Sequence, residues 1–438
     1  MWKTLKNALM VEEVRKRLIF TFGILVVVRI GALIPVPGVN TEYFAEWFES
    51  QSGTAFNFFD AMTGGSFTDM SVFALSITPY ITSSIIMQLL TIAIPKLEEL
   101  HKEGEHGRKL ISRITRFLCV GLALIESAAM VIGFGNAGLL VDYTWYNVII
   151  AIATMTAGSA VLMWLGECIT EKGVGNGISI VLLINILSQI PDDFASLYER
   201  FIADQTVPMA ILYAAIIAVV ILAMVVFVVL LQGGERRIPV QYAKKIQGRR
   251  TYGGNSSNIP LKVNTAGVIP VIFASSLMTF PVVIAQFFDV DYTTIGGRIL
   301  MGLSSSNWCD PSDPILSIGL LVYIVLIVAF AYFYTSITFN PIEIADNMKK
   351  QGGFIPGIRP GRPTSDYLQR ILNYIVFIGA AGLTIVAVIP IVISGLFSIS
   401  QLSFGGTSII IIVGVILETL KQIESLMLVR YYKGFLTE

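Results

Sequence analysis

Long apolar runs separated by short polar segments dominate this chain. A membrane-spanning helix needs about 20 mostly apolar residues, and ten stretches approach that length. We expect ten spans, at about 18–34, 72–94, 117–134, 146–169, 174–190, 208–231, 264–285, 315–337, 371–390 and 407–428. Gly and Pro recur inside several of them, which membrane helices tolerate when neighbouring helices satisfy the freed backbone groups. The pattern therefore predicts an all-α polytopic membrane protein.

The composition agrees with this pattern. Hydrophobic residues make up 54% of the 438 residues and charged residues only 14%, and the mean hydropathy is +0.73. Because an average soluble domain carries about 25% charged residues, much of this surface must face lipid. The same values exclude a disordered chain, and three cysteines without a CxxC spacing exclude a disulfide-stapled scaffold. We interpret Cys119, Cys168 and Cys309 as structural or incidental.

Positive charges fall almost entirely on one side of the predicted membrane. Of the 30 Lys and Arg residues, 27 lie in the N-terminal segment, in alternate loops and in the C-terminal region. Only Arg29, Arg200 and Arg298 lie elsewhere. The positive-inside rule then predicts that both termini are cytoplasmic. Since one missed or extra helix would scramble this asymmetry, it also supports the count of ten.

Two of the predicted cytoplasmic loops, 232–262 and 338–370, are unusually long, basic and rich in Gly and Pro. Long structured loops often carry function. One interpretation is that their charges only orient the neighbouring helices. The other is that they form a docking surface for a cytoplasmic partner.

Segment 53–71 is too polar to span a membrane and too apolar for an ordinary loop. Its aromatic residues and Met62 share one face of a short helix that Gly64 and Gly65 would end, and Pro79 breaks the apolar stretch that follows. A half-helix that returns into a protein-lined cavity fits this pattern. An external loop lying at the membrane interface fits it as well.

Catalytic constellations are absent from the sequence. No Gly-Lys dipeptide occurs, which excludes a P-loop, and His101 and His106 lack a zinc-ligand spacing. We therefore expect no enzymatic activity, no metal site and no cofactor. Only Glu126 and Glu167 are acids well inside spans; a structural or gating contact of Glu126 with Gln88 is favoured over proton coupling. A secondary transporter with broken helices stays open as the alternative, although its midplane site would have to use these two acids.

Several motifs resemble one family over essentially the whole chain. Residues 339–350 (FNPIEIADNMKK) and 352–361 (GGFIPGIRPG) closely resemble the cytoplasmic loop between helices eight and nine of the bacterial SecY family. Residues 236–243 (RRIPVQYA) are similar to the loop between helices six and seven. Further matches fall on helices two, five and seven, at 77–81 (ITPYI), 175–179 (GNGIS) and 266–276 (AGVIPVIFASS).

The resemblance implies a protein-conducting channel with the SecY translocon fold, built from two pseudo-symmetric five-helix halves, 1–190 and 191–438. It implies that unfolded polypeptides pass across the cytoplasmic membrane of a bacterium and that apolar segments leave sideways into the lipid bilayer. It implies a pore ring of Ile77, Ile81, Ile178, Leu182, Ile272 and Ile411. It implies that residues 56–71, which we call the plug segment, form a plug. The key residues of this segment are Phe56, Asn57, Phe58, Phe59, Asp60, Met62, Gly64, Gly65 and Phe67.

The resemblance also implies a lateral gate between helices two and seven, with Gln88, Glu126, Ser275, Ser276 and Thr279 beside it. Since the chain lacks an ATP site, energy must come from elsewhere. The resemblance implies the ATPase SecA or a translating ribosome as its source, with contact to ribosomal RNA as one option. The residues implied for docking are Arg236, Arg237, Lys244, Lys245, Arg249, Arg250, Arg359, Pro360 and Arg362, with Arg359 first. SecE and SecG are the small membrane subunits that the family implies.

Overall fold

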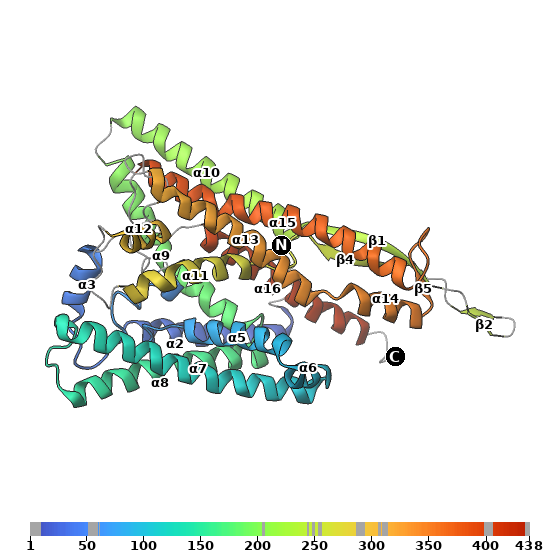
Figure 1. Cartoon of the computed structure of the whole chain (residues 1–438), viewed down its shortest axis with the longest axis horizontal. Coiled ribbons are helices and arrows are strands. Elements are labelled where there is room, and N and C mark those ends of the chain that lie inside the picture. Colours follow the sequence, from blue (N-terminus) through green and yellow to red (C-terminus); the bar gives the residue numbers. More distant parts are fainter. Residues whose placement is uncertain are drawn as a thin grey trace. The chain divides into compact units, whose positions relative to one another are not determined.

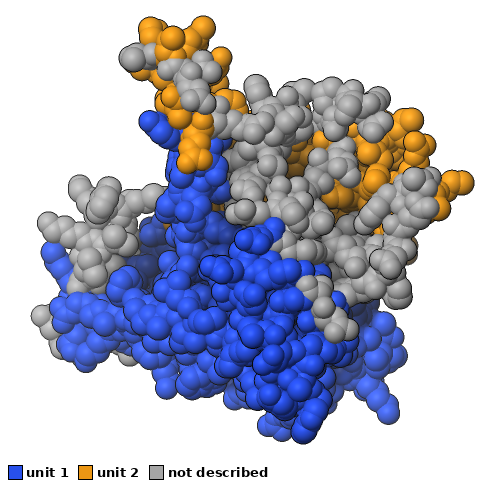
Figure 2. Space-filling model, turned by 90° about the vertical axis from the view of Figure 1, so that its left-hand side faces the viewer, with its two compact units in different colours: residues 1–198, 400–403, 418–438 blue, residues 199–399, 404–417 orange. Residues whose placement is uncertain are grey.

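The chain divides into two compact units in a computed structural model. Unit 1 comprises residues 1–198, 400–403 and 418–438, and unit 2 comprises 199–399 and 404–417 (Figure 2). The structure describes residues 10–50, 60, 62–203, 206–242, 245–247, 250–252, 256–285, 294–304, 308, 314–397 and 406–433.

Unit 1 is built from helices and turns in its described residues. The helices are α2 (Glu12–Ala32), α3 (Thr41–Ser50), α5 (Thr78–Ala93), α6 (Pro95–Lys102), α7 (Glu105–Phe134), α8 (Trp145–Lys172) and α9 (Gly177–Phe201). The long α7 and α8 lie side by side (Figure 1), and the hydroxyl groups of Ser127 and Thr156 join them at 2.9 Å. The division between the units falls near the end of α9 and within α16 (Gly406–Lys433).

The helix α5 begins later than the hydrophobic pattern predicts. The predicted span starts at 72, but residues 72–77 form turns and the helix starts at Thr78. Pro79 occupies one of the first helical positions, where its fixed φ and its missing N–H are tolerated. The apolar residues before it therefore belong to the preceding turn segment.

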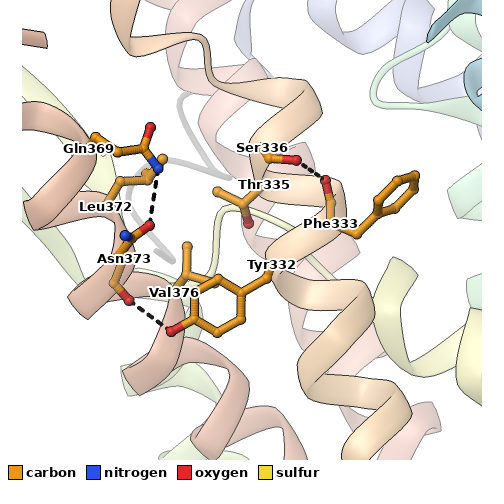
Figure 3. A pocket seen from close by; sticks show the side chains of 8 residues that line it. All are labelled: Tyr332, Phe333, Thr335, Ser336, Gln369, Leu372, Asn373 and Val376. Atoms are coloured by element: carbon orange, nitrogen blue, oxygen red, sulfur yellow. Dashed lines mark hydrogen bonds between the residues drawn. The ribbon is translucent and has the colours of Figure 1, made fainter. Parts of the chain in front are cut away.

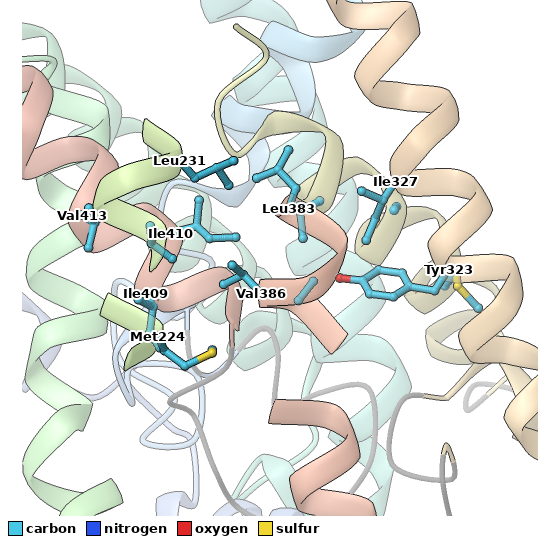
Figure 4. Packing of buried hydrophobic residues seen from close by; sticks show 14 of the residues in the cluster. Met224, Leu231, Tyr323, Ile327, Leu383, Val386, Ile409, Ile410 and Val413 are labelled. Atoms are coloured by element: carbon cyan, nitrogen blue, oxygen red, sulfur yellow. The ribbon is translucent and has the colours of Figure 1, made fainter. Parts of the chain in front are cut away.

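Unit 2 contains the remaining helices. They are α10 (Val207–Gly233), α11 (Ile269–Ala285), α12 (Ile295–Leu303), α13 (Ile318–Thr338), α14 (Pro341–Lys350), α15 (Arg362–Phe397) and the first part of α16, with a 3-10 turn at Pro314–Ser317. A hydrophobic core joins α10, α11, α13, α15 and α16 (Figure 4). Val228, Ile327 and Ile410 are completely buried in it.

The two long loops carry β-structure, which the sequence did not predict. Strands β1 (Glu235–Tyr242) and β4 (Ser256–Lys262) pair antiparallel, with Ile238 opposite Ile259. The short strand β5 (Gly353–Phe354), from the other loop, pairs with the end of β1, and β2 (Lys245–Gln247) pairs with β3 (Arg250–Tyr252). The order β4-β1-β5 therefore joins both loops in one sheet.

A small hydrophobic core lies under this sheet. Ile238 and Val240 alternate inward along β1, and they pack with Ile355 and with Leu368 of α15. The side chain of Asn340 accepts hydrogen bonds from the backbone of Ile342 and Glu343, which starts α14 beside the same core. Both loops are thus ordered by burial of apolar side chains.

Truncating Leu368 should loosen this loop structure. Leu368 is completely buried, and a buried Leu→Ala change costs about 2–5 kcal/mol. We expect Leu368→Ala to raise the rate at which a protease cleaves between β1 and β4, while Ile342→Ala, at an exposed position, should change it little. Equal cleavage rates in the two variants would contradict this core.

The helices fit the predicted membrane topology. Six of them in the described residues are long and apolar enough to cross a membrane, and α5 with α6, a pair bent by 106°, would be a seventh span. Each of the ten predicted spans contains a helix, including α2, α11 and α16. The fold is therefore that of a polytopic helical membrane protein with a small sheet in its long loops.

Candidate functional site

The predicted pore-ring residues lie on four helices. Ile77 is completely buried and precedes α5, and Ile81 follows one turn later and is half-buried. Ile178 and Leu182 have the same four-residue spacing at the start of α9. In unit 2, Ile272 of α11 and Ile411 of α16 are 7% and 4% exposed. All six are aliphatic side chains on or next to helices, and their assembly into one ring stays a prediction.

The plug segment is described from Asp60 onward, except for residue 61; Phe56, Asn57, Phe58 and Phe59 lie outside the described residues. Residues 60, 62 and 63 are helical, and Gly64 and Gly65 end this helix with φ of +71° and +83°. Only glycine adopts such angles readily. Met62 and Phe67 are buried, at 5% and 7% exposed. This part of the segment is therefore folded back against its own unit.

Hydrogen bonds from two helices hold this part of the plug segment. Asn185 Nδ2 of α9 donates to the carbonyl oxygen of Met62 at 3.4 Å. The hydroxyl group of Ser188 donates mainly to the carbonyl oxygen of Asn185, at 2.6 Å, and also lies 3.4 Å from the carbonyl oxygen of Gly64. Gln189 Nε2 donates to both the carbonyl and the carboxylate of Asp60, at 3.2 and 2.7 Å. Arg29 Nη1 of α2 donates to the carbonyl oxygen of Gly64 at 3.2 Å.

Asp60 is a half-buried carboxyl group that accepts hydrogen bonds from Thr68 and Gln189. Burial raises the pKa of Asp60 above its usual range, and hydrogen bonds from Thr68 and Gln189 oppose this shift. The backbone N–H of Thr68 donates to Asp60 Oδ1 at 3.1 Å. Asp60 therefore closes the segment on itself and binds it to α9 at the same time.

The predicted gate residues differ in their surroundings. Gln88 on α5 is exposed and Glu126 on α7 is half-buried, and no hydrogen bond joins these two described side chains. Ser275 on α11 lies 3.1 Å from the hydroxyl group of Tyr323 on α13. Ser276 is exposed, and the side chain of Thr279 lies outside the described residues.

The predicted docking arginine lies on a rigid turn. Ile355, 3% exposed, anchors the turn in the core under the sheet. Gly357 and Gly361 take φ of +83° and +99° on either side of Arg359, and Thr364 Oγ1 donates to the carbonyl of Arg359 at 2.8 Å. The side chain of Arg359 is exposed and forms no ion pair with a described residue. It is therefore presented outward by a backbone that does not depend on it.

The other predicted docking residues lie around this turn or in the neighbouring loop. Pro360 and Arg362 are both exposed next to Arg359. Arg236 is exposed on β1, and Arg237 is paired with Glu235 at 2.5 Å. Lys245 and Arg250 lie in β2 and β3, where only the backbone is described, and Lys244 and Arg249 lie outside the described residues.

A groove of about 320 Å³ lies between α13 and α15 in unit 2 (Figure 3). Its polar groups largely satisfy one another: the Tyr332 hydroxyl donates to the Asn373 carbonyl at 3.1 Å, and Gln369 Nε2 donates to Asn373 Oδ1 at 3.1 Å. Its lining has no charged side chain. It contains none of the predicted site residues.

Sequence reasoning missed Asn185, Ser188 and Gln189. A signal was present, because three polar residues lie within five positions at the end of the otherwise apolar span 174–190. Spacings of three and four residues place them on one face of a helix. Polar residues inside a predicted membrane helix are expensive and therefore mark a contact.

The fold defines a multi-pass helical membrane protein in which the described part of residues 56–71 is folded against helices of its own unit. The SecY family model matches residues 71–420. The SecY subunit of the protein translocase of Mycobacterium tuberculosis is 41% identical to this chain, over 98% of each chain.

Two solved structures share the fold at a low sequence identity. One is a structure of a SecY channel, in which the plug domain is described as stabilising the closed state of the translocation channel and maintaining a membrane seal. It has a TM-score of 0.61 at 20% identity and covers 94% of this chain and 92% of its own. The other is Sec61 in the canine ribosome-channel complex from the endoplasmic reticulum, with a TM-score of 0.60, 20% identity and the same coverage.

The chain belongs to the SecY family. It is a multi-pass protein of the plasma membrane and functions as a protein-conducting translocation channel. Family membership does not favour the secondary-transporter alternative.

Proposed function

We propose that this channel passes unfolded polypeptides through a constriction formed by Ile77, Ile81, Ile178, Leu182, Ile272 and Ile411. A peptide backbone cannot cross lipid directly, because each unsatisfied polar group costs several kcal/mol. A water-filled passage with one narrow point removes most of this cost. Aliphatic side chains make no sequence-specific bonds, so they can close on any chain and stop ions by dewetting.

One observation carries this proposal: the described part of the plug segment is packed and hydrogen-bonded against α9 and α2 instead of extending as a loop. An idle channel that admits large substrates requires a segment that closes it reversibly. The plug segment would fill the external side of the constriction until a substrate enters.

The lateral gate is part of the same proposal. Helices α5 and α11 would part so that an apolar signal sequence or membrane span leaves into lipid, a transfer that the hydrophobic effect favours. Gln88 and Glu126 would lie on one side of the gate and Ser275, Ser276 and Thr279 on the other. The hydroxyl contact between Ser275 and Tyr323 supports a link between α11 and its neighbour α13 during this movement.

The cytoplasmic partners would dock on loops 232–262 and 338–370. The canine relative is described in a complex with a ribosome, and we propose that a ribosome or the ATPase SecA binds here. A guanidinium group on a rigid turn presents a fixed fork to carboxylates or to RNA phosphates. SecE and SecG would complete the membrane complex, with both termini of this chain in the cytoplasm.

Crosslinking from a stalled substrate tests the constriction. We place a photoreactive residue at each of the six ring positions and, as controls on the same helices, at the exposed positions Ile92 and Ile416. The stalled polypeptide should crosslink to the ring positions and not to the controls. Equal crosslinking at ring and control positions would contradict the proposed path.

A further inference from the structure

One face of α9 is polar where it meets the plug segment. Asn185, Ser188 and Gln189 share this face, and the two amides donate hydrogen bonds to the segment. The Ser188 hydroxyl group, which donates to the Asn185 carbonyl at 2.6 Å, makes a longer contact of 3.4 Å with the carbonyl oxygen of Gly64. Asn185 and Gln189 are 3% and 8% exposed. The remaining atom of the Gln189 amide, Oε1, is buried without a partner among the described residues. Asp60 is thus the group that orients this side chain.

The acceptors on the plug segment are mainly backbone carbonyl groups. Those of Asp60, Met62 and Gly64 accept from α9, and that of Gly64 also accepts from Arg29 of α2. Such contacts depend on the path of the backbone and not on the identity of the side chains. Two helices therefore hold the segment at the same carbonyl group, that of Gly64.

The close approach at Gly64 makes this contact specific to the folded-back position. A Cβ atom at Gly64 would lie 2.7 Å from the carbonyl oxygen of Asn185 and 2.8 Å from its Cα. At Gly65, which has a similar φ, the nearest atom would be Gln189 Nε2 at 3.9 Å. Of these two glycines, only Gly64 is pressed directly against the backbone of α9.

Asn185 also reaches the turn segment that follows the plug segment. Its Nδ2 atom donates to Ser76 Oγ at 3.0 Å, and Ser159 Oγ of α8 donates to the Ser76 carbonyl at 3.2 Å. Ser76 and Met70 have φ of +49° and +45°, values that are strained for residues other than glycine. Hydrogen bonds from neighbouring helices thus hold a strained stretch of backbone that would relax if they were released.

We propose that Asn185, Ser188 and Gln189 of α9, with Arg29 of α2, form a latch that holds the plug segment in its closed position and sets how easily the channel opens. This inference rests on the proposed role of residues 56–71 as a plug. These are positioning residues, since they contact the plug segment and not the substrate. A few hydrogen bonds suit the task, because the contacts of each side chain contribute about a fivefold factor to an equilibrium and a substrate can displace them together.

The test is the double variant Asn185→Leu/Gln189→Leu, which keeps side-chain size and removes the donors. The matched control is Gln369→Leu/Asn373→Leu, an amide pair with the same four-residue spacing on α15 of unit 2. Losing the bonds of both amides should raise the resting ion conductance of the purified channel in lipid bilayers by roughly 30-fold. The control should leave it unchanged.

A second readout reports the position of the segment. In a channel without native cysteines, Met62→Cys is buried and should react slowly with a membrane-impermeant thiol reagent. The latch variant should increase this rate, and the control should not. Conductance through channels held open by a substrate should be the same in all variants, because the latch acts only on the closed state. A variant with a general folding defect would also change the conductance of the channels held open by a substrate.

A glycine pair tests the same contact from the plug side, without changing α9. Gly64→Ala and Gly65→Ala suffer the same penalty for a positive φ, but only the former collides with Asn185. Gly64→Ala should therefore leak ions more than Gly65→Ala. Equal leaks would contradict the close docking on α9.

Comparison with a channel that lacks residues 57–68 separates the plug assignment from the latch. If the deletion leaks and the latch variant does not, the plug stands and the latch is wrong. If the channel that carries the deletion does not leak, the plug assignment is wrong, and the latch proposal that rests on it is wrong as well.

Discussion

We expect a channel that lacks residues 57–68 to leak ions at rest. This segment supplies the carbonyl groups of Asp60, Met62 and Gly64, which accept hydrogen bonds from α9 and α2. Each such bond contributes about 1 kcal/mol, and the deletion removes all of them together with the buried side chains of Met62 and Phe67. We expect the resting conductance to rise by about 30-fold or more, because the bonds that hold the closed state are lost together.

Single-channel recording in planar bilayers measures this effect. A variant in which a Gly/Ser linker of equal length replaces residues 57–68 separates the loss of contacts from the loss of length, and it should leak as well. Substrate translocation should continue in both variants, since the constriction is intact. A resting conductance equal to that of the unaltered channel would show that this segment does not seal it.

We expect reversal of the charge of Arg359 to abolish transport driven by SecA. Arginines at the centre of protein interfaces often contribute about 2 kcal/mol or more, which is roughly 30-fold in affinity, and a glutamate adds repulsion to the loss. The fold should persist, because Ile355, the two glycines with positive φ and the hydroxyl group of Thr364 hold the turn without the Arg359 side chain.

Translocation of a secretory protein into membrane vesicles tests this expectation. The matched control is Arg108→Glu, which reverses an exposed charge near the start of α7, outside both docking loops, and should transport nearly normally. Arg359→Lys should be intermediate, because it keeps the charge and loses the planar fork. Normal transport by Arg359→Glu would remove Arg359 from the docking surface.

Hydropathy predicted the helices of this chain because the formation of membrane spans depends mainly on one free energy, that of transferring apolar residues to lipid. Each predicted span contains a helix, even where α2 carries Arg29 near its end. The start of α5 was misplaced by six residues because apolar character does not distinguish a buried turn from a helix. Only Pro79 marked the true beginning.

The sheet in the two long loops escaped prediction for a different reason. Pro239 lies within β1, and proline usually argues against a strand because it removes a ladder hydrogen bond. The partner strand β5 is only two residues long, and it belongs to the other loop, far away in the sequence. No local pattern reports such a pairing.

The plug contacts on α9 were only partly predictable. The polar stripe of Asn185, Ser188 and Gln189 was visible in the sequence, but its partners were mainly backbone carbonyl groups, which have no sequence signature. Glu126 and Gln88 drew attention instead because they are polar residues in apolar spans, and they are not hydrogen-bonded to each other. The type of a residue shows that it requires a polar contact, and only the structure shows which group is its partner.

The sheet β4-β1-β5 has a mechanical consequence for the channel. It ties the turn that presents Arg359 to β1, which continues from α10, and to β4, which leads into α11 through residues 263–268. That connection is stiffened by hydrogen bonds from Val263 to Gly234 and from Asn264 to Gly267. A partner that displaced either loop would therefore move the whole sheet, and residues 263–268 would pass this movement to α11, the helix that carries Ile272 and Ser275.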